Sequence, residues 1–273
     1  MFDTIAEMLS HAFIQRAVLV GSLVSLCAAL LGVSLVLKRY SMIGDGLSHV
    51  GFGILTVSTV LGVTSPLYIS IPGVAIFAII LLKIGSNSKL KSDSAIALIS
   101  SSALAIGVAV TSVTTGMNTD VCNFMFGSIL AMNMADVYLS VGVSIIVAIL
   151  FVIYYRKLFV VTFDENFARA SGLKAGRYTN IIAVLTALII VIGMRMMGVM
   201  LISSIIIFPA LTSMRVFKTY KRVVISSAAI SIITFLLGIY MSYLYNISTG
   251  AMIVIVNMIF FIVFSIIERI IYE

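Results

Sequence analysis

The chain has 273 residues, of which 62% are hydrophobic and 10% are charged, and its mean hydropathy is +1.23. Soluble globular domains carry about 25% charged residues, so this composition excludes a water-soluble domain. It indicates an all-α protein that crosses a membrane several times. The net charge of +7 would suit a nucleic-acid partner. The positions of the basic residues instead predict that they set the orientation of the helices in the membrane.

Apolar runs separated by charged or turn-rich breaks predict about nine transmembrane helices. An α-helix needs roughly 20 residues to cross a hydrocarbon core of about 30 Å. The expected helices cover residues 14–37, 42–62, 66–84, 94–115, 134–155, 178–194, 198–214, 222–243 and 249–269. Residues 116–133, between the fourth and fifth helices, are too apolar for a solvated loop and predict a short re-entrant or interfacial helix.

The lysine and arginine residues set the orientation of these helices. Of the 17 in the chain, all except Arg16 and Arg195 fall at the connections that follow the odd-numbered helices, or at the C-terminus. Positively charged connections stay in the cytoplasm during insertion. We therefore expect the N-terminus outside and the C-terminus in the cytoplasm. The basic residues then serve topology, and no nucleic-acid partner is expected.

The second expected helix carries two ionisable residues, Asp45 and His49. Residues four apart share one helix face, and with Tyr40 at the inner edge His49 would lie about 14 Å deep, near the middle of the membrane. Ionisable groups at this depth are costly, and they line a pathway or pair with one another. A carboxylate and an imidazole suit zinc, manganese or ferrous iron. Both residues are therefore candidate metal contacts. The structural alternative is that Asp45 caps the helix and His49 donates to a carbonyl.

The longest polar stretch, residues 161–177, separates the fifth and sixth expected helices. Acidic residues at its start favour a helix N-terminus, and a glycine near its end suits a C-cap. We expect a short amphipathic helix near residues 163–173, outside the bilayer. It either only connects two spans along the membrane surface or docks a soluble partner. The acidic start favours a partner, since the inner leaflet is itself negative. The candidate docking residues are Phe163, Asp164, Glu165, Phe167, Arg169 and Gly172.

The sequence contains no G-x-x-x-x-G-K-[ST] segment, the loop that cradles nucleotide phosphates in many ATPases. If the chain moves its substrate uphill with ATP, the nucleotide must therefore bind a separate chain. We expect this chain to have no catalytic residue and no resident cofactor, because a metal ion bound at Asp45 and His49 would be the transported substrate.

Four stretches, in this order, resemble the membrane permeases of ATP-binding-cassette (ABC) transporters for zinc, manganese and iron. They are L-K-R-Y-S-M-I-G-D-G-L-S-H-V-G, V-C-N-F-M-F-G-S-I-L, F-D-E-N-F-A-R-A-S-G-L and G-V-M-L-I-S-S-I-I-I-F-P-A-L-T-S. The resemblance implies a single permease domain, residues 1–273, in a multi-pass homodimer of the cell membrane. It also implies two cytoplasmic ATPase subunits, an extracytoplasmic metal-binding protein, metal contact by Asp45 and His49, and a coupling helix near residues 163–173.

Three other functions stay open at this point. A permease for an iron-siderophore or cobalamin shares the architecture, but a bulky organic ligand does not need the acid–histidine pair. A gradient-driven secondary transporter would work without an ATPase. An intramembrane enzyme is disfavoured, because the chain has only two histidines and His11 precedes the first span, which leaves too few groups for a catalytic site.

Overall fold

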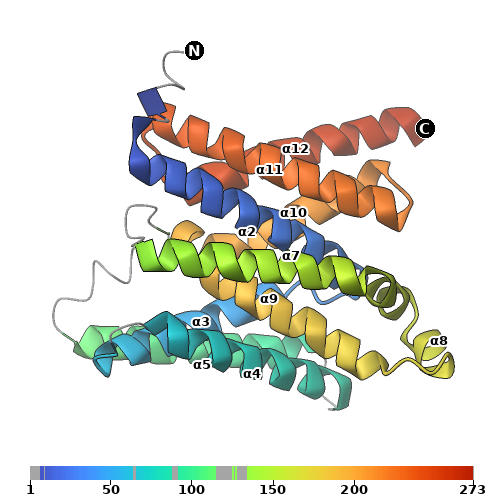
Figure 1. Cartoon of the computed structure of the whole chain (residues 1–273), viewed down its shortest axis with the longest axis horizontal. Helices are drawn as coiled ribbons and strands as arrows, with labels where there is room; N and C mark the ends of the chain where they lie inside the picture. Colours follow the sequence, from blue (N-terminus) through green and yellow to red (C-terminus); the bar gives the residue numbers. More distant parts are fainter. Residues whose placement is uncertain are drawn as a thin grey trace.

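A computed structural model describes residues 7–8, 10–63, 66–87, 92–114, 125, 127 and 134–272, and every regular element in these ranges is a helix. The helices are α2 (Ala12–Leu37), α3 (Ile43–Val60), α4 (Pro66–Asn87), α5 (Ser92–Val113), α7 (Met134–Phe163), α8 (Glu165–Ala170), α9 (Ala175–Met197), α10 (Val199–Val216), α11 (Tyr220–Tyr245) and α12 (Thr249–Tyr272). They lie side by side, with the start of α2 and the end of α12 at opposite ends of the molecule and α8 at the same end as the end of α12 (Figure 1). The prediction of an all-α membrane protein is confirmed.

Seven of the described helices are long and apolar enough to cross a membrane: α2, α4, α5, α7, α9, α11 and α12. α10 is a shorter apolar helix, and α3 carries Asp45 and His49, which lower its hydropathy. The expectation of nine spans, which includes α3 and α10, stays a prediction, as does the orientation of the termini. The expected re-entrant helix at residues 116–133 lies almost entirely outside the described residues.

The expected and observed helix bounds agree within a few residues except in α7. This helix was expected to end at residue 155, at the start of the basic pair Arg156–Lys157, but it continues to Phe163. The added turns pack an aromatic surface against the start of α11: the ring centroids of Phe159 and Phe163 lie 5.0 and 5.9 Å from that of Tyr220. Charged residues therefore end the apolar run here without ending the helix, because tertiary contacts stabilise the continuation.

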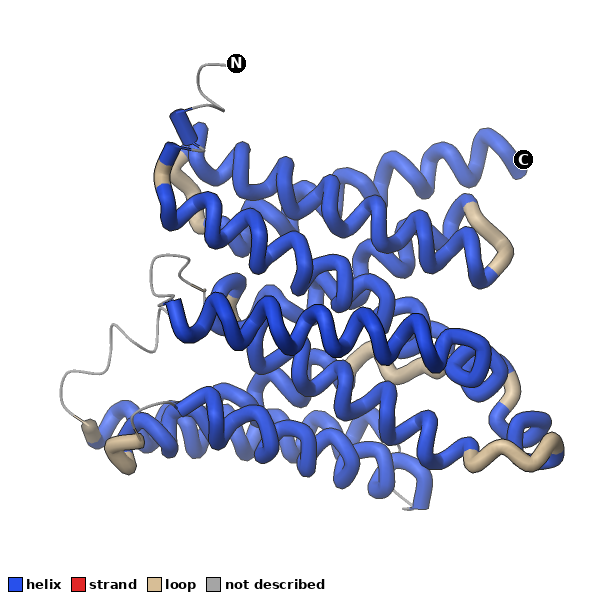
Figure 2. The backbone as a smooth tube through the Cα atoms, in the orientation of Figure 1, coloured by secondary structure: helices blue, strands red, loops and turns tan. Residues whose placement is uncertain are grey.

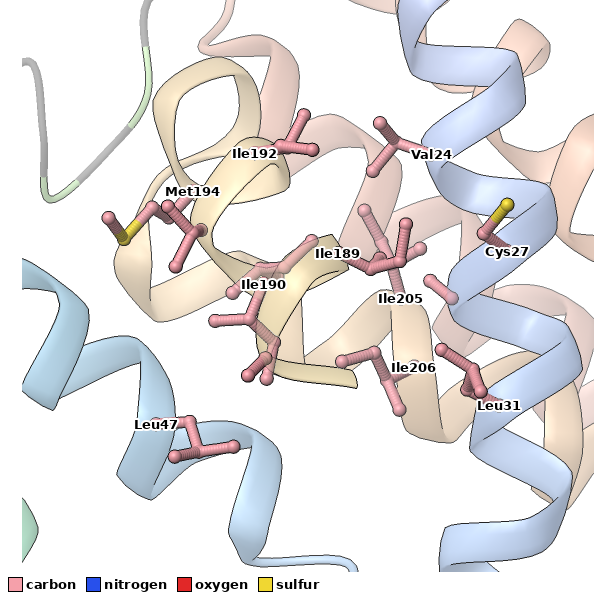
Figure 3. Close-up of a cluster of buried hydrophobic side chains, with 14 of the residues drawn as sticks. Val24, Cys27, Leu31, Leu47, Ile189, Ile190, Ile192, Met194, Ile205 and Ile206 are labelled. Atoms are coloured by element: carbon pink, nitrogen blue, oxygen red, sulfur yellow. The ribbon is translucent and has the colours of Figure 1, made fainter. Parts of the chain in front are cut away.

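The core lies where α2, α3, α9 and α10 meet. Figure 3 shows apolar side chains from all four helices converging there, among them Leu31, Leu47, Ile189 and Ile206, and each of these is at most 2% exposed. Since lipid tails are as apolar as these side chains, the helices associate mainly through close packing rather than through exclusion of water.

Hydrogen bonds from hydroxyl groups join α2 to α11 within this apolar interior. The Ser231 hydroxyl donates to the carbonyl oxygen of Ser25 at 2.8 Å, and the oxygens of Ser34 and Tyr220 lie 3.1 Å apart. Such interhelical hydrogen bonds contribute roughly 0.6 kcal/mol each in membrane proteins. They fix the register of the two helices rather than dominate their stability.

A glycine lets α2 approach α10 closely. A Cβ atom at Gly32 would collide with the backbone carbonyl of Ile206, and backbone cannot move aside as the tip of a flexible side chain can. Gly142 in α7 offers a contrast, since a Cβ there would have no neighbour within 4 Å.

We expect Gly32→Ala to destabilise the folded protein by about 1–3 kcal/mol, the usual cost of overpacking. Gly142→Ala should be neutral or stabilise it by about 0.5–1 kcal/mol, because alanine is the better helix former. Thermal unfolding of the two purified variants in detergent measures the difference. Equal stability of the two would show that the α2–α10 crossing is not tight at Gly32.

Candidate functional site

The two ionisable residues of α3 lie on one face, as their spacing predicts. Asp45 is in the first turn of the helix, and its Oδ2 lies 3.7 Å from Nε2 of His49 one turn later. The Asp45 side chain is 39% exposed in the single chain and the His49 side chain 12%. The pair therefore has one partly open member and one enclosed member.

The structural alternatives for this pair find no support in the geometry. The N-cap residue of α3 is Met42, and no side chain caps the helix start there. Nδ1 of His49 is buried and has no hydrogen-bond partner among the described residues. A buried polar atom left without a partner costs free energy, so the imidazole keeps a hydrogen-bonding capacity that the described residues do not use.

The separation of the two side chains is close to that of two ligands of one ion. Two atoms bound at about 2.1 Å to a tetrahedral metal lie about 3.4 Å apart, and Oδ2 and Nε2 are 3.7 Å apart. Within the described residues, however, no group of three or more His, Cys, Asp or Glu side chains could hold a metal ion. The described part of one chain therefore offers two donors, fewer than the four or more that such ions take.

The glycines around the pair serve close packing, and α3 is an unbroken helix. A Cβ at Gly46 would lie 2.6 Å from Cγ2 of Ile96, and one at Gly53 would lie 2.8 Å from the carbonyl oxygen of Ala103, both in α5. A Cβ at Gly51 would lie 2.9 Å from Sδ of Met194 in α9. α3 is thus clasped by its neighbours, which fixes the direction of Asp45 and His49.

The polar stretch after α7 forms the short helix α8, closed at both ends by its own residues. Asp164 is the N-cap, and its Oδ1 accepts a 2.8 Å hydrogen bond from the amide of Phe167. At the other end Gly172 has a φ of +80°. The amides of Gly172 and Leu173 bond back to the carbonyls of Arg169 and Ala168 at 3.0 Å each. This is a Schellman motif, whose left-handed position favours glycine.

The six candidate docking residues divide by their surroundings. Phe163 ends α7 rather than lying in the short helix, and it is 58% exposed; Phe167 is 60% exposed. Arg169 is exposed as well, whereas Asp164 and Gly172 close the helix ends. Large exposed aromatic groups at a helix tip form a surface suited to a partner. Short loops join α8 to α7 and α9 at this end of the molecule (Figure 2).

Glu165 points back toward the protein through one of its oxygens. Its Oε2 lies 3.3 Å from Nζ of Lys38, and its Oε1 accepts a 2.6 Å hydrogen bond from Arg169. Burial alone would raise the pKa of Glu165, but the Arg169 hydrogen bond and the Lys38 charge more than offset it and lower the pKa below its ordinary 4.5. Burial lowers the pKa of Lys38, and Glu165 opposes that shift.

Sequence reasoning foresaw none of the long-range ion pairs, and two of them bear on the site and on α8. One is Lys38–Glu165, and the other joins Arg195 at the end of α9 to Asp136 at the start of α7 at 2.8 Å. The only signal for the second pair was that Arg195 is one of two basic residues on the expected outer side. Neither partner could be read from local spacing.

Comparisons with known proteins cover nearly the whole chain. The model of the ABC 3 transport family matches residues 10–268. The chain is 31% identical to the manganese import system permease protein ScaB of Streptococcus gordonii, covering 92% of this chain and 90% of that protein. It is also 31% identical to a probable iron transport system membrane protein of Haemophilus influenzae, covering 96% of each. The solved PsaBC of Streptococcus pneumoniae in complex with Fab superposes with a TM-score of 0.86 at 30% identity, covering 96% of this chain and 94% of that one.

The lowered pKa of Glu165 predicts how its contribution to stability depends on pH. A carboxyl whose folded pKa is depressed stabilises the fold above its unfolded pKa, and this contribution is lost as the pH falls through the folded value. We expect Glu165→Gln to be less stable than wild type at neutral pH. The difference should shrink as the pH falls below 4.5. Thermal unfolding at several pH values measures it, and a difference independent of pH would contradict the assignment.

Proposed function

The chain belongs to the ABC 3 transport family, and on that premise we propose that it is the permease subunit of an importer for divalent transition-metal ions: zinc, manganese or iron. It is a multi-pass protein of the cell membrane. As a permease it contributes transport rather than catalysis, and ATP hydrolysis belongs to a separate ATPase chain.

The observation that carries this proposal is the Asp45–His49 pair. Oδ2 of Asp45 and Nε2 of His49 lie 3.7 Å apart on one face of α3, and no described residue bonds to the other imidazole nitrogen, Nδ1. Borderline divalent ions prefer this combination of oxygen and nitrogen donors. A large chelate would not need it, so the pair favours a bare ion over an iron-siderophore or cobalamin.

Two copies of the chain would complete the site. Each copy offers two donors, and a two-fold axis brings the same surface patch of each copy together. Asp45 and His49 from both copies then supply four donors, enough for a weak ion site. Weak binding suits transport, because an ion held too tightly would not leave.

Uphill movement of the ion requires two access states driven by ATP. In our proposal two ATPase subunits dock under the dimer, with α8 of each copy as the coupling helix. The exposed aromatic rings of Phe163 and Phe167 would enter an apolar groove of the ATPase. ATP binding draws the ATPases together and rocks the two permease copies, while an extracytoplasmic binding protein delivers the ion from outside.

Similarity to known permeases does not identify the transported metal. Relatives with equal identity are named for manganese and for iron, and the donor pair also accepts zinc. Discrimination therefore rests partly on the protein that delivers the ion. The metal content of that protein, purified natively, would identify the cargo.

We expect His49→Ala and Asp45→Ala each to lower metal uptake on the order of tenfold or more, since even the outer partners of metal ligands contribute 10–100-fold. The measurement is cellular accumulation of Mn²⁺, Zn²⁺ and Fe²⁺ at matched abundance of the permease in the membrane. Thr59→Val is the matched control, because the Thr59 hydroxyl lies on the same helix and donates to the Leu55 carbonyl of that helix. If His49→Ala takes up metal at the wild-type rate, the imidazole has no role in the path of the ion.

We expect Phe167→Asp to abolish co-purification of the ATPase while the permease still inserts, because it places a charge in a proposed apolar contact. Arg177→Ala is the control, since Arg177 is also exposed near this end but lies in α9. The measurement is the ATPase recovered per tagged permease from membranes. Undiminished recovery with Phe167→Asp would refute docking through α8.

A further inference from the structure

One lysine at the end of α2 joins three elements that are far apart in the sequence. Nζ of Lys38 lies 3.3 Å from Oε2 of Glu165 in α8 and donates a 2.8 Å hydrogen bond to Oγ1 of Thr179 in α9. The Lys38 side chain is only 7% exposed, so its charge is held between the helices rather than in water. α8 is therefore tied to α2 by a partly buried contact, in addition to its loops to α7 and α9.

The other oxygen of the Glu165 carboxylate belongs to the outer surface of α8. It accepts its hydrogen bond from Arg169, whose side chain is 65% exposed. One carboxylate thus has an exposed guanidinium on one side and a buried ammonium on the other. When a partner displaces α8, Glu165 moves with it, and Lys38 must follow or lose its counter-charge.

The chain runs from Lys38 through a tight turn into α3, which begins at Ile43. Arg39 has a φ of +60°, and the amides of Arg39 and Tyr40 bond back to the last turn of α2 at 3.0 and 2.9 Å. The amide of Ile43 then bonds to the carbonyl of Tyr40 at 3.0 Å. This connection is short and internally hydrogen-bonded, so it transmits a displacement rather than absorbing it.

We propose that the Lys38–Glu165 pair is the link that passes a displacement of α8 to the first turn of α3, where Asp45 lies. The inference rests on the proposed function, in which α8 is the docking site of the ATPase. A shift of this turn changes the distance between the Asp45–His49 pair and its copy across the dimer axis. Lys38 is a positioning residue, since it contacts the docking segment only at Glu165, on the side that faces the protein, and lies outside the Asp45–His49 pair.

The burial of Lys38 explains why the link would hold throughout a transport cycle. In a low-dielectric setting an ion pair is stronger than in water, and separating it leaves an uncompensated buried charge. Thr179 adds a second anchor, because its hydroxyl holds the ammonium against α9. A displacement of α8 therefore also displaces α2 and α9, instead of being absorbed by the loops that flank α8.

The test uses the complete complex of permease and cognate ATPase in proteoliposomes, with uptake of Mn²⁺, Zn²⁺ and Fe²⁺ and hydrolysis of ATP measured together. In Lys38→Met we expect normal ATPase recovery and continued hydrolysis, but a fall in metal transported per ATP on the order of tenfold, typical of a coupling between two sites. Lys38→Arg keeps the charge and should restore most of the ratio, which separates lost coupling from misfolding.

Lys218→Met is the matched control. It removes a lysine 3.4 Å from Glu268, also in an ion pair but 57% exposed, and it should leave the ratio of metal to ATP unchanged. An unchanged ratio in Lys38→Met, or an equal fall in Lys218→Met, would overturn the proposed link. Loss of ATPase recovery in Lys38→Met would overturn it as well, because Lys38 would then only support α8. Failure of the wild-type chain to retain the ATPase would instead refute the docking role itself.

Discussion

Polar groups inside a bilayer must find partners within the protein, and this constraint organises the whole molecule. Hydroxyls in the helices bond to carbonyls of their own turn, as Thr56 does with Phe52 at 2.8 Å, or to a neighbouring helix. Arg195 and Asp136 neutralise each other at 2.8 Å. Among the described residues, five buried side-chain atoms have no such partner: the hydroxyls of Ser144, Thr162, Thr212 and Ser265, and Nδ1 of His49, the one aromatic nitrogen in this group. An unpaired polar atom is costly in hydrocarbon. In the proposed function the ion is bound through the other nitrogen, Nε2, which lies 3.7 Å from the Asp45 carboxylate.

The glycines beside the pair determine how that site can move. They let α3 pack so closely against α5 and α9 that a Cβ atom at any of the three positions would force a neighbour to shift. A helix clasped in this way shifts as a body together with its neighbours rather than by bending, because close-packed interiors do not deform continuously. The site on α3 is therefore controlled from the ends of the helix, and its first turn is the end nearer to the cytoplasmic machinery in the expected topology.

α8 is built for rigidity at that end. Its side-chain N-cap and its Schellman motif satisfy backbone groups that a free helix of six residues would leave open. A six-residue helix is too short to be stable alone, so its shape depends on these caps and on the contacts of Glu165 and Ala168 with the body of the protein. A capped helix with exposed aromatic rings and a partly buried ion pair to α2 can both receive a displacement and pass it on.

The sequence by itself determined the helix positions, the shared face of Asp45 and His49, and the cap at Gly172. Each depends on residues within a few positions of one another, through apolar runs, four-residue spacing and backbone conformation. Only the tertiary structure decided that α7 continues past Arg156 to Phe163, since Tyr220 of α11 stabilises those turns. It also decided that Lys38 meets Glu165, 127 residues away. Such contacts depend on how the helices pack in space, and spacing along the chain does not specify that packing.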